Sequence, residues 1–162
     1  MKKILALASL ALVLAGTAQA QSATISATAD VQVALTVAGT RALSFGAAFP
    51  NTTRTIATTN PSAGYFTLNG ANNAEVSITF PSLPTDLVNG AINLPVTFTS
   101  AWASTLAGSQ TAIGNMAAAT LQRLDASAGT LFVFVGGSVS PTTQASGTYT
   151  GTVTLNAAYT GN

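Results

Sequence analysis

The stretch ATISATADVQVALTV, residues 23–37, alternates strictly between apolar and mostly polar side chains. Every odd-numbered residue in it is apolar, and the even-numbered residues are mostly Thr, Ser, Asp or Gln. A period of two predicts a β-strand with one buried and one solvent-facing side. The 15 residues would extend about 50 Å at about 3.3 Å each, whereas an ordinary strand has about five or six residues. So long a strand raises the question of what its apolar side packs against.

The residues before this stretch have the features of a secretory signal peptide. Two lysines follow Met1, residues 4–14 form an apolar run, and residues 18–20 (Ala-Gln-Ala) have the small-x-small form of a cleavage site. The apolar run has 11 residues, whereas a membrane-spanning helix needs roughly twenty. We therefore expect residues 1–20 to be removed on export, so that the mature chain begins near Gln21.

Removal of the leader changes the charge of the chain. The 162 residues include five Lys and Arg, four Asp and Glu, no His and no Cys. Both lysines lie in the leader, so the remaining 142 residues carry three arginines against four carboxylates, a net charge of −1. Nucleic-acid binding needs clustered cations that displace counterions from phosphate, so we expect no nucleic-acid partner. A chain of this length is enough for one domain, which must be stable without disulfides.

The inventory of reactive side chains excludes most enzyme classes. Without His and Cys, ordinary zinc sites and His-based catalytic triads are excluded, and the mature chain has no Lys for Schiff-base chemistry. The four carboxylates lie in separate segments. They remain open as a glycosidase pair or as calcium ligands, with exposed turn and strand positions as the simpler alternative. We therefore predict no catalytic, cofactor-binding or metal-binding residues, no cofactor and no enzymatic activity.

The rest of the sequence predicts a series of short strands separated by Gly, Pro and Asn. The run LFVFV, residues 131–135, is apolar on both sides and predicts a central strand closed by Gly136-Gly137. Pro95 predicts an edge strand or a bulge, and residues 101–124 are compatible with either a short helix or a loop followed by a strand. Further alternating residues are Leu43 and Phe45, Phe66 and Leu68, Val76, Ile78 and Phe80, Ile92 to Phe98, and Tyr149 to Tyr159. About seven strands predict an all-β sandwich or barrel.

Three segments carry a resemblance to known proteins: LSFG at 43–46, AGYFTLNG at 63–70 followed by AEVSITFP, and the terminal GTYTGTVTLNAAY. They resemble a family of small exported β-sandwich proteins of Gram-negative bacteria, itself of uncharacterised function. That family is similar to pilin subunits of the chaperone–usher class and to spore-coat-U-like pilins. The resemblance implies an immunoglobulin-like antiparallel β-sandwich of about seven strands, which lacks one strand and assembles into surface fibres.

The same resemblance gives the N-terminal stretch a role as a donor strand. Residues 21–31 would complete the sheet of a neighbouring subunit, and about residues 32–37 would continue into the subunit's own first strand. Such a strand pairs with an exposed sheet edge, and a contact donated on one side and accepted on the other builds an open filament. The expected boundaries are 1–20 for the signal peptide, 21–38 for the N-terminal extension and 39–162 for the sandwich. The side chains expected to enter the groove are Ile25, Ala27, Ala29 and Val31.

The end of the chain is similar to the strand that such pilins use for chaperone capture. Gly147 or Gly151 matches its glycine and Tyr159 its aromatic residue. Tyr159 is fourth from the end of the sequence, whereas the aromatic residue of those pilins is the penultimate one. The candidate C-terminal strand motif consists of Gly151, Val153, Leu155 and Tyr159.

The resemblance also implies partners and a location. The partners are copies of this chain or other pilin-like subunits, together with a periplasmic chaperone and usher. The protein would be exported through the inner membrane to the periplasm and then to the cell surface or the extracellular space, without stable insertion into a membrane.

Three alternatives remain open. The long strand could fold back as the first strand of a complete monomeric sandwich. A small outer-membrane β-barrel fits the length and the alternation, but one Trp and three Tyr are few for its aromatic girdles, and seven charged residues in the mature chain are few for its lumen. A monomeric secreted binding module would expose aromatic or clustered polar groups, for which Trp102 is the one candidate, with core packing as its simpler role.

Overall fold

The computed structural model describes residues 21–29, 31 and 33–161, so the predicted signal peptide lies outside the described residues. The chain divides into two units, Met1–Val31 and Gln32–Asn162. The described residues of the first unit form no strand, and their side chains are exposed. All ten strands belong to the second unit. In the described part of the chain, no helix has the length and hydropathy to cross a membrane.

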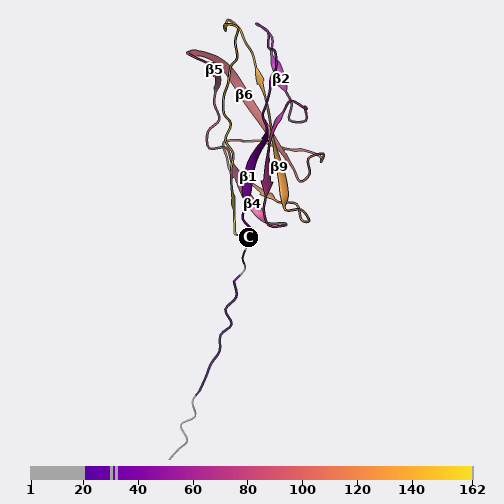
Figure 1. The fold of residues 1–162 in the computed structure, drawn as a ribbon, viewed down its shortest axis with the longest axis vertical. Helices are drawn as coiled ribbons and strands as arrows, with labels where there is room; N and C mark the ends of the chain where they lie inside the picture. The colour runs from indigo at the N-terminus through magenta and orange to yellow at the C-terminus, as the bar shows by residue number, and fades with distance from the viewer. Residues whose placement is uncertain (1–20, 30, 32, 162) are drawn as a thin grey trace, which may run out of the picture. The chain divides into compact units, whose positions relative to one another are not determined.

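The strands form two antiparallel sheets, which confirms the predicted all-β sandwich (Figure 1). The larger sheet has the order β1-β3-β9-β6-β5, with β2 also beside β9 and β7 also beside β6, and the smaller sheet has the order β10-β4-β8. The strands of the larger sheet are β1 (Thr36–Arg41), β2 (Arg54–Ile56), β3 (Gly64–Asn69), β5 (Asp86–Asn89), β6 (Ile92–Ala103), β7 (Thr111–Ile113) and β9 (Thr130–Val139). The smaller sheet consists of β4 (Glu75–Thr79), β8 (Thr120–Arg123) and β10 (Asn156–Tyr159).

The described residues contain ten strands where about seven were expected, because two long strands each have two partners along one side. On one side of β9, the partner is β3 along residues 130–135 and β2 along residues 137–139. On one side of β6, the partner is β5 along residues 92–95 and β7 along residues 100–102. The strands β2 and β7 have only three residues each.

The strand β9 is central, as the run LFVFV predicts, because β6 pairs along its other side. Leu131, Val133 and Val135 are buried in the main core. Phe132 and Phe134 point to the opposite side, where their rings pack against Tyr65.

The strand does not end at Gly136-Gly137 as expected but continues to Val139, because β2 and β6 pair with it there. Glycine is required at position 136 because the main chain of β2 approaches closely there, and not because the chain turns. A Cβ at Gly136 would collide with the Ile56 carbonyl oxygen.

Other predicted features of the strands are also found. Val76 and Ile78 are buried on β4, which ends at Thr79, and Phe80 is buried just before Pro81. Pro95 lies in the part of β6 that pairs with β5 alone, because β9 begins to pair at Val96. Proline lacks an N–H to donate, so it is tolerated in such a local edge.

Residues 101–124 contain strands and loops rather than a helix. The strand β6 continues to Ala103, and β7 and β8 follow. Trp102 is half-buried and packs against the main core, so core packing, the simpler of its two proposed roles, is the one observed.

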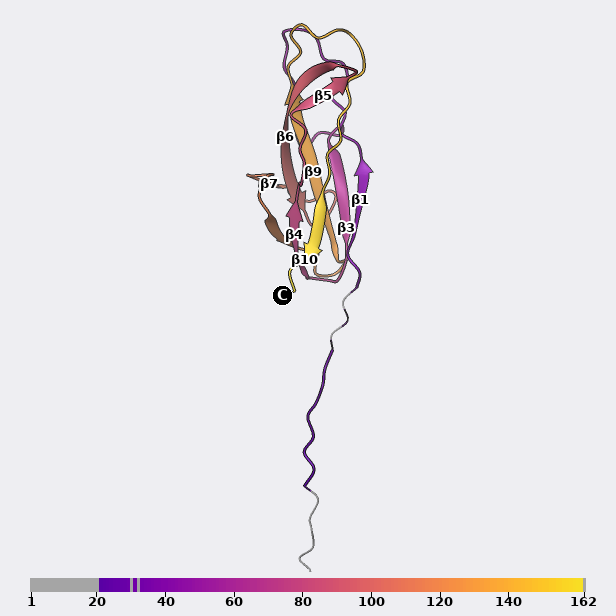
Figure 2. The same cartoon turned by 90° about the vertical axis from the view of Figure 1, so that its left-hand side faces the viewer.

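The main core lies between the two sheets, which face each other in Figure 2. Its central side chains come from both sheets and are at most 1% exposed: Leu68, Val76, Ile78, Leu131 and Val133. A second, smaller cluster contains the buried residues Leu94, Val96 and Val139.

Candidate functional site

The segment that leads into β10 is the first wall of the candidate site (Figure 2). Tyr149 packs against the second cluster, and Val153 and the buried Leu155 pack against the main core. The threonines between them, at positions 150, 152 and 154, are exposed. The predicted alternation from Tyr149 to Tyr159 is therefore confirmed, although strand structure is assigned only from Asn156 onward.

Among the described residues, none pairs with the main chain of residues 151–155. The Thr150 N–H and C=O both bond to Val88, at 3.0 and 2.8 Å, and the Thr160 N–H bonds to the Glu75 carbonyl oxygen at 3.2 Å. Within this described stretch, residues 151–155 make no hydrogen bond to another residue.

The residue numbers of the bonded groups show on which side of the segment the main-chain N–H and C=O groups have no partner. Successive residues of an extended chain direct their main-chain groups to opposite sides. Thr150 and Thr160 both bond toward β4 and β5, so even-numbered residues direct their groups to that side. The odd-numbered residues Gly151, Val153 and Leu155 consequently direct theirs to the other side, where no strand lies alongside.

Residues 42–50, which follow β1, form the second wall. Leu43 packs against the main core, and Phe45 and Ala48 pack against the second cluster. The alternation at Leu43 and Phe45 is therefore found in their packing, but residues 42–49 form no strand. Few main-chain bonds fix this wall, such as the one from the Ser44 N–H to the Ser62 carbonyl oxygen at 3.0 Å.

A groove of about 980 Å³ lies between the two walls. Its floor consists of apolar side chains from the larger sheet: Phe66, Leu87, Leu94, Phe98, Val135 and Val139. The volume is at the upper end of the range of about 300–1,000 Å³ for small-molecule sites.

One cationic side chain lines the groove. Arg41 is the one charged residue among those that line it. Its Nε donates to the Ala63 carbonyl oxygen at 2.6 Å, and its guanidinium carbon lies 4.8 Å from the centroid of the Tyr65 ring. The floor is apolar, and the walls add uncharged polar side chains such as Ser44, Gln144 and Ser146. The groove is therefore suited to an uncharged occupant that presents an apolar side to the floor.

The predicted donor segment exposes apolar side chains, which match the apolar floor of the groove. Residues 21–29 and 31 are exposed, and the structure gives Ile25 and Val31 exposed fractions of 96% and 91%. Ala27 and Ala29 are exposed as well. An isolated exposed apolar residue is ordinary, but a regular row of them is typical of a surface that binds a partner.

The four residues of the predicted C-terminal motif lie in one continuous segment. Gly151 and Val153 line the groove, Leu155 is buried in the main core, and Tyr159 lies in β10. Gly151 lies over the floor, since a Cβ there would come within 2.8 Å of Leu87 Cδ2.

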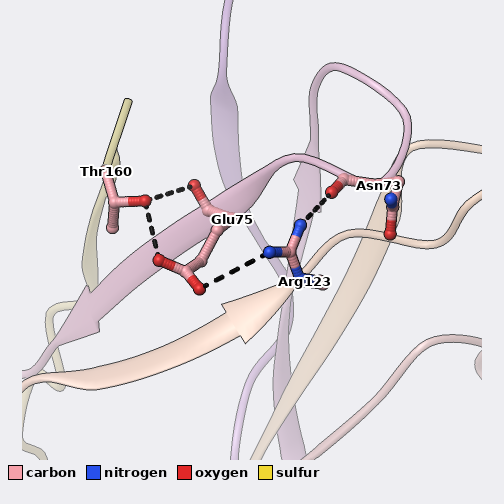
Figure 3. A network of polar contacts seen from close by, with 4 residues as sticks. All are labelled: Asn73, Glu75, Arg123 and Thr160. Carbon is pink, nitrogen blue, oxygen red and sulfur yellow. Dashed lines mark hydrogen bonds and ion pairs between the residues drawn. The ribbon is translucent and has the colours of Figure 1, made fainter. Parts of the chain in front are cut away.

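Polar contacts fasten the residue after β10 (Figure 3). The Thr160 hydroxyl donates to Glu75 Oε1 at 2.8 Å, and Glu75 Oε2 lies 3.9 Å from an Arg123 nitrogen. Arg123 also donates to the Asn73 carbonyl oxygen at 3.0 Å. The ion pair contributes little stability, because the Arg123 side chain is 54% exposed and water screens the charges.

The three described carboxylates lie in separate elements. Glu75 lies in β4, Asp86 begins β5 and Asp125 follows β8, and no three of His, Cys, Asp or Glu cluster among the described residues. Hydrogen bonds from the Ser127 hydroxyl and from the Ala128 and Ser127 N–H groups lower the pKa of Asp125 below its ordinary value. This side chain closes an exposed turn.

A family described as a domain of unknown function, DUF4402, matches residues 22–159. The chain belongs to the DUF4402 family. A search of curated proteins finds no match. The part of the chain that matches DUF4402 contains the exposed alternating segment, both walls of the groove and β10.

Sequence reasoning did not find every part of the site in this DUF4402 chain. It placed Gly151 and Val153 in one segment but assigned residues 42–50 no role as a wall. A signal was present there, since Phe45 and Phe49 flank small residues that cannot fill a core themselves. It also gave the Tyr159 hydroxyl no contacts, because those depend on segments far apart in the sequence.

Proposed function

We propose that this protein is a structural, non-enzymatic, exported subunit of fimbrial or pilin-like character, which assembles by donor-strand addition. Residues 21–31 of one copy bind in the groove of the next copy. The observation that carries this proposal is the pairing of an exposed alternating segment with an apolar groove whose edge has unpaired main-chain groups, both within one chain.

The dimensions of the two parts support the proposal. The donor face runs from Ile25 to Val31, seven residues that extend about 23 Å at about 3.3 Å each. Residues 144–153 line the groove on the side of the segment before β10, so this wall is longer than the donor face. A donor strand alongside this wall would pair with the free main-chain groups of Gly151, Val153 and Leu155.

The free energy of the proposed contact depends on both side-chain burial and main-chain hydrogen bonds. Burial of Ile25 and of Val31 contributes about 1.5–3 kcal/mol each, and each main-chain hydrogen bond contributes a net of about 0.5–1.5 kcal/mol. Association itself costs about 4–15 kcal/mol. The loss of a few of these contributions is therefore enough to prevent assembly.

The lining of the groove supports a binding role rather than a catalytic one. It contains no carboxylate, and the sequence has no His or Cys that could act as a base or nucleophile. The same proposal includes an immunoglobulin-like topology, a periplasmic chaperone and usher as partners, and export of the protein to the cell surface. A copy that donates on one side and accepts on the other forms a contact that does not close, and so builds a filament.

A pair of matched substitutions tests the donor segment. Ala29 and Thr28 are neighbours, both exposed in the single chain, so neither change should affect the isolated fold. Ala29→Asp places an unpaired carboxylate in an apolar groove, at a cost of several kcal/mol. Native mass spectrometry and electron microscopy should then show multimers or thin fibres for the unaltered protein and for Thr28→Asp, but monomers for Ala29→Asp.

Deletion of residues 21–31 separates donation in trans from a self-complete sandwich. The truncated chain should remain a folded monomer and bind a synthetic peptide with the sequence of residues 21–31. A peptide with Asp at the position of Ala29 is the control and should not bind. Full-length protein that stays monomeric, with residues 21–31 paired to its own sheet, would refute the proposal.

A further inference from the structure

One tyrosine hydroxyl joins three segments that are far apart in the sequence. Tyr159 Oη accepts a hydrogen bond from the Ala71 N–H at 2.6 Å and donates one to the Val33 carbonyl oxygen at 2.8 Å. Ala71 lies between β3 and β4, Tyr159 ends β10, and Val33 precedes β1. A hydroxyl has one proton and two lone pairs, so one oxygen can make both bonds.

The surroundings of Tyr159 hold this oxygen in place. The ring is half-buried and packs against the main core. Gly70 lets the loop before β4 approach, since a Cβ there would collide with the Tyr159 hydroxyl and come within 2.9 Å of Leu124 Cδ1. The Gly70 N–H is itself bonded to the Gly129 carbonyl oxygen at 2.9 Å. The position of the hydroxyl is therefore fixed by the packing and does not depend on Val33.

Val33, in contrast, depends on the hydroxyl. Its side chain is 63% exposed, and β1 begins only at Thr36. Between them, Leu35 packs against the main core. No hydrogen bond to another residue is found within 21–29 and 31, so the Tyr159 bond is the first main-chain contact along the described chain.

We propose that Tyr159 is a positioning residue, which fixes the point where the donor segment leaves the folded unit. This inference rests on the proposed function. When Val31 of one copy is bound in the next, the free chain between two folded units ends at the first fixed residue. That residue is Val33 with the hydroxyl bond, and without it the first fixed residue is Leu35, which packs against the main core. The reach of the linker then grows from about 7 Å to about 14 Å.

A short linker restrains the angle between successive units, because few conformations connect two fixed ends. A longer flexible linker permits many angles. The Tyr159 hydroxyl would therefore set the stiffness of the fibre, while the groove sets whether a fibre forms. The two roles can be tested separately.

The test compares Tyr159→Phe with Tyr65→Phe in the full chain. Each change removes one hydroxyl and keeps the ring, but within the described residues the Tyr65 hydroxyl has no hydrogen-bond partner. The Tyr65 ring packs against Phe132 and Phe134. Tyr65 also lines the groove, so the donor peptide should be shown to bind Tyr65→Phe as it binds the unaltered truncated chain. Fibres of Tyr159→Phe should have a persistence length, measured by electron microscopy, that falls by about half or more. Fibres of Tyr65→Phe should match the unaltered protein.

Two measurements on single chains accompany the fibres. In Tyr159→Phe without residues 21–31, the Ala71 amide should lose its protection from hydrogen exchange, and ¹⁵N relaxation should show residues 33 and 34 as mobile as a free end, while Leu35 stays packed against the main core. The donor peptide should bind this variant as well as it binds the unaltered truncated chain. A merely structural role would instead alter the unfolding midpoint alone.

Each outcome decides between the hypotheses. Fibres of Tyr159→Phe that are as straight as those of Tyr65→Phe would overturn the positioning role, and so would rigid residues 33 and 34 in the variant. If the unaltered truncated chain binds no peptide, the proposed function fails. The relaxation of residues 33 and 34 then decides alone whether Tyr159 fixes Val33.

Discussion

Gly70 and Tyr159 should be energetically coupled, and a double-mutant cycle measures the coupling. A Cβ at position 70 would meet the Tyr159 hydroxyl first and Leu124 Cδ1 next, at 2.9 Å. The substitution Gly70→Ala therefore overpacks this contact, and overpacking costs about 1–3 kcal/mol. Tyr159→Phe leaves the half-buried Ala71 N–H and the Val33 carbonyl without their partner, at a cost of about 1–2 kcal/mol.

The two costs should not add. Phenylalanine lacks the oxygen that the new methyl group meets first, so part of the collision disappears in the double variant. The contact with Leu124 remains, so the relief is incomplete. We expect the double variant to be more stable than the sum of the single changes predicts by about 1 kcal/mol, a magnitude ordinary for residues in contact.

Urea unfolding of the chain without residues 21–31 gives the four free energies, since a monomer has no assembly equilibrium to complicate the transition. The slope of the free energy against urea should be the same in all four proteins. Additive free energies within about 0.3 kcal/mol would contradict the close approach of Gly70 to the hydroxyl.

Three further predictions concern stability in the same truncated chain. Leu131→Ala should lower the free energy of unfolding by about 2–5 kcal/mol, because Leu131 is 0% exposed, whereas Leu121→Ala should have little effect because Leu121 is 56% exposed; urea midpoints measure both. The lowered pKa of Asp125 means that its stabilising effect is present above the ordinary value of 3.8 and is lost as the pH falls through the lower folded value. The variant Asp125→Ala should therefore be less stable than the unaltered chain at pH 6 and should approach its stability only in acid. Urea midpoints measured between pH 6 and 2 test this. A difference between the two midpoints that does not change with pH would count against it. Arg123→Ala should cost less than about 1 kcal/mol in the same assay, and a larger loss would mean that the exposed pair with Glu75 matters more than its geometry indicates.

Local patterns predicted the strands well where one side of the strand is buried. The alternation at Val76 and Ile78 and the doubly apolar run at 131–135 each correspond to an observed strand, because burial imposes the same period on sequence and structure. The continuation of β9 through Gly136 could not be predicted, since it depends on where the distant strands β2 and β6 pair.

The candidate site was predictable only in part, for a related reason. The alternations from Tyr149 to Tyr159 and from residue 23 to residue 37 are local features, and both could be identified in the sequence. The groove forms because residues 42–50 and 144–153 lie on either side of the same floor. The sequence of residues 151–155 does not show that their main-chain groups lack a neighbouring strand, because this depends on where the distant segments of the chain lie.

The meeting of Val33, Tyr159 and Thr160 has a consequence for engineering. In the proposed fibre, cargo fused directly after β10 would sit close to Val33, where the donor segment leaves the folded unit, and its bulk would hinder docking. The loop between β6 and β7, residues 104–110, lines no part of the groove, and Leu106 in it is 51% exposed. Exposed loop tips are the sites that best tolerate insertions. A peptide inserted at Leu106 would be carried once per subunit, which would make the fibre a scaffold for regularly spaced display.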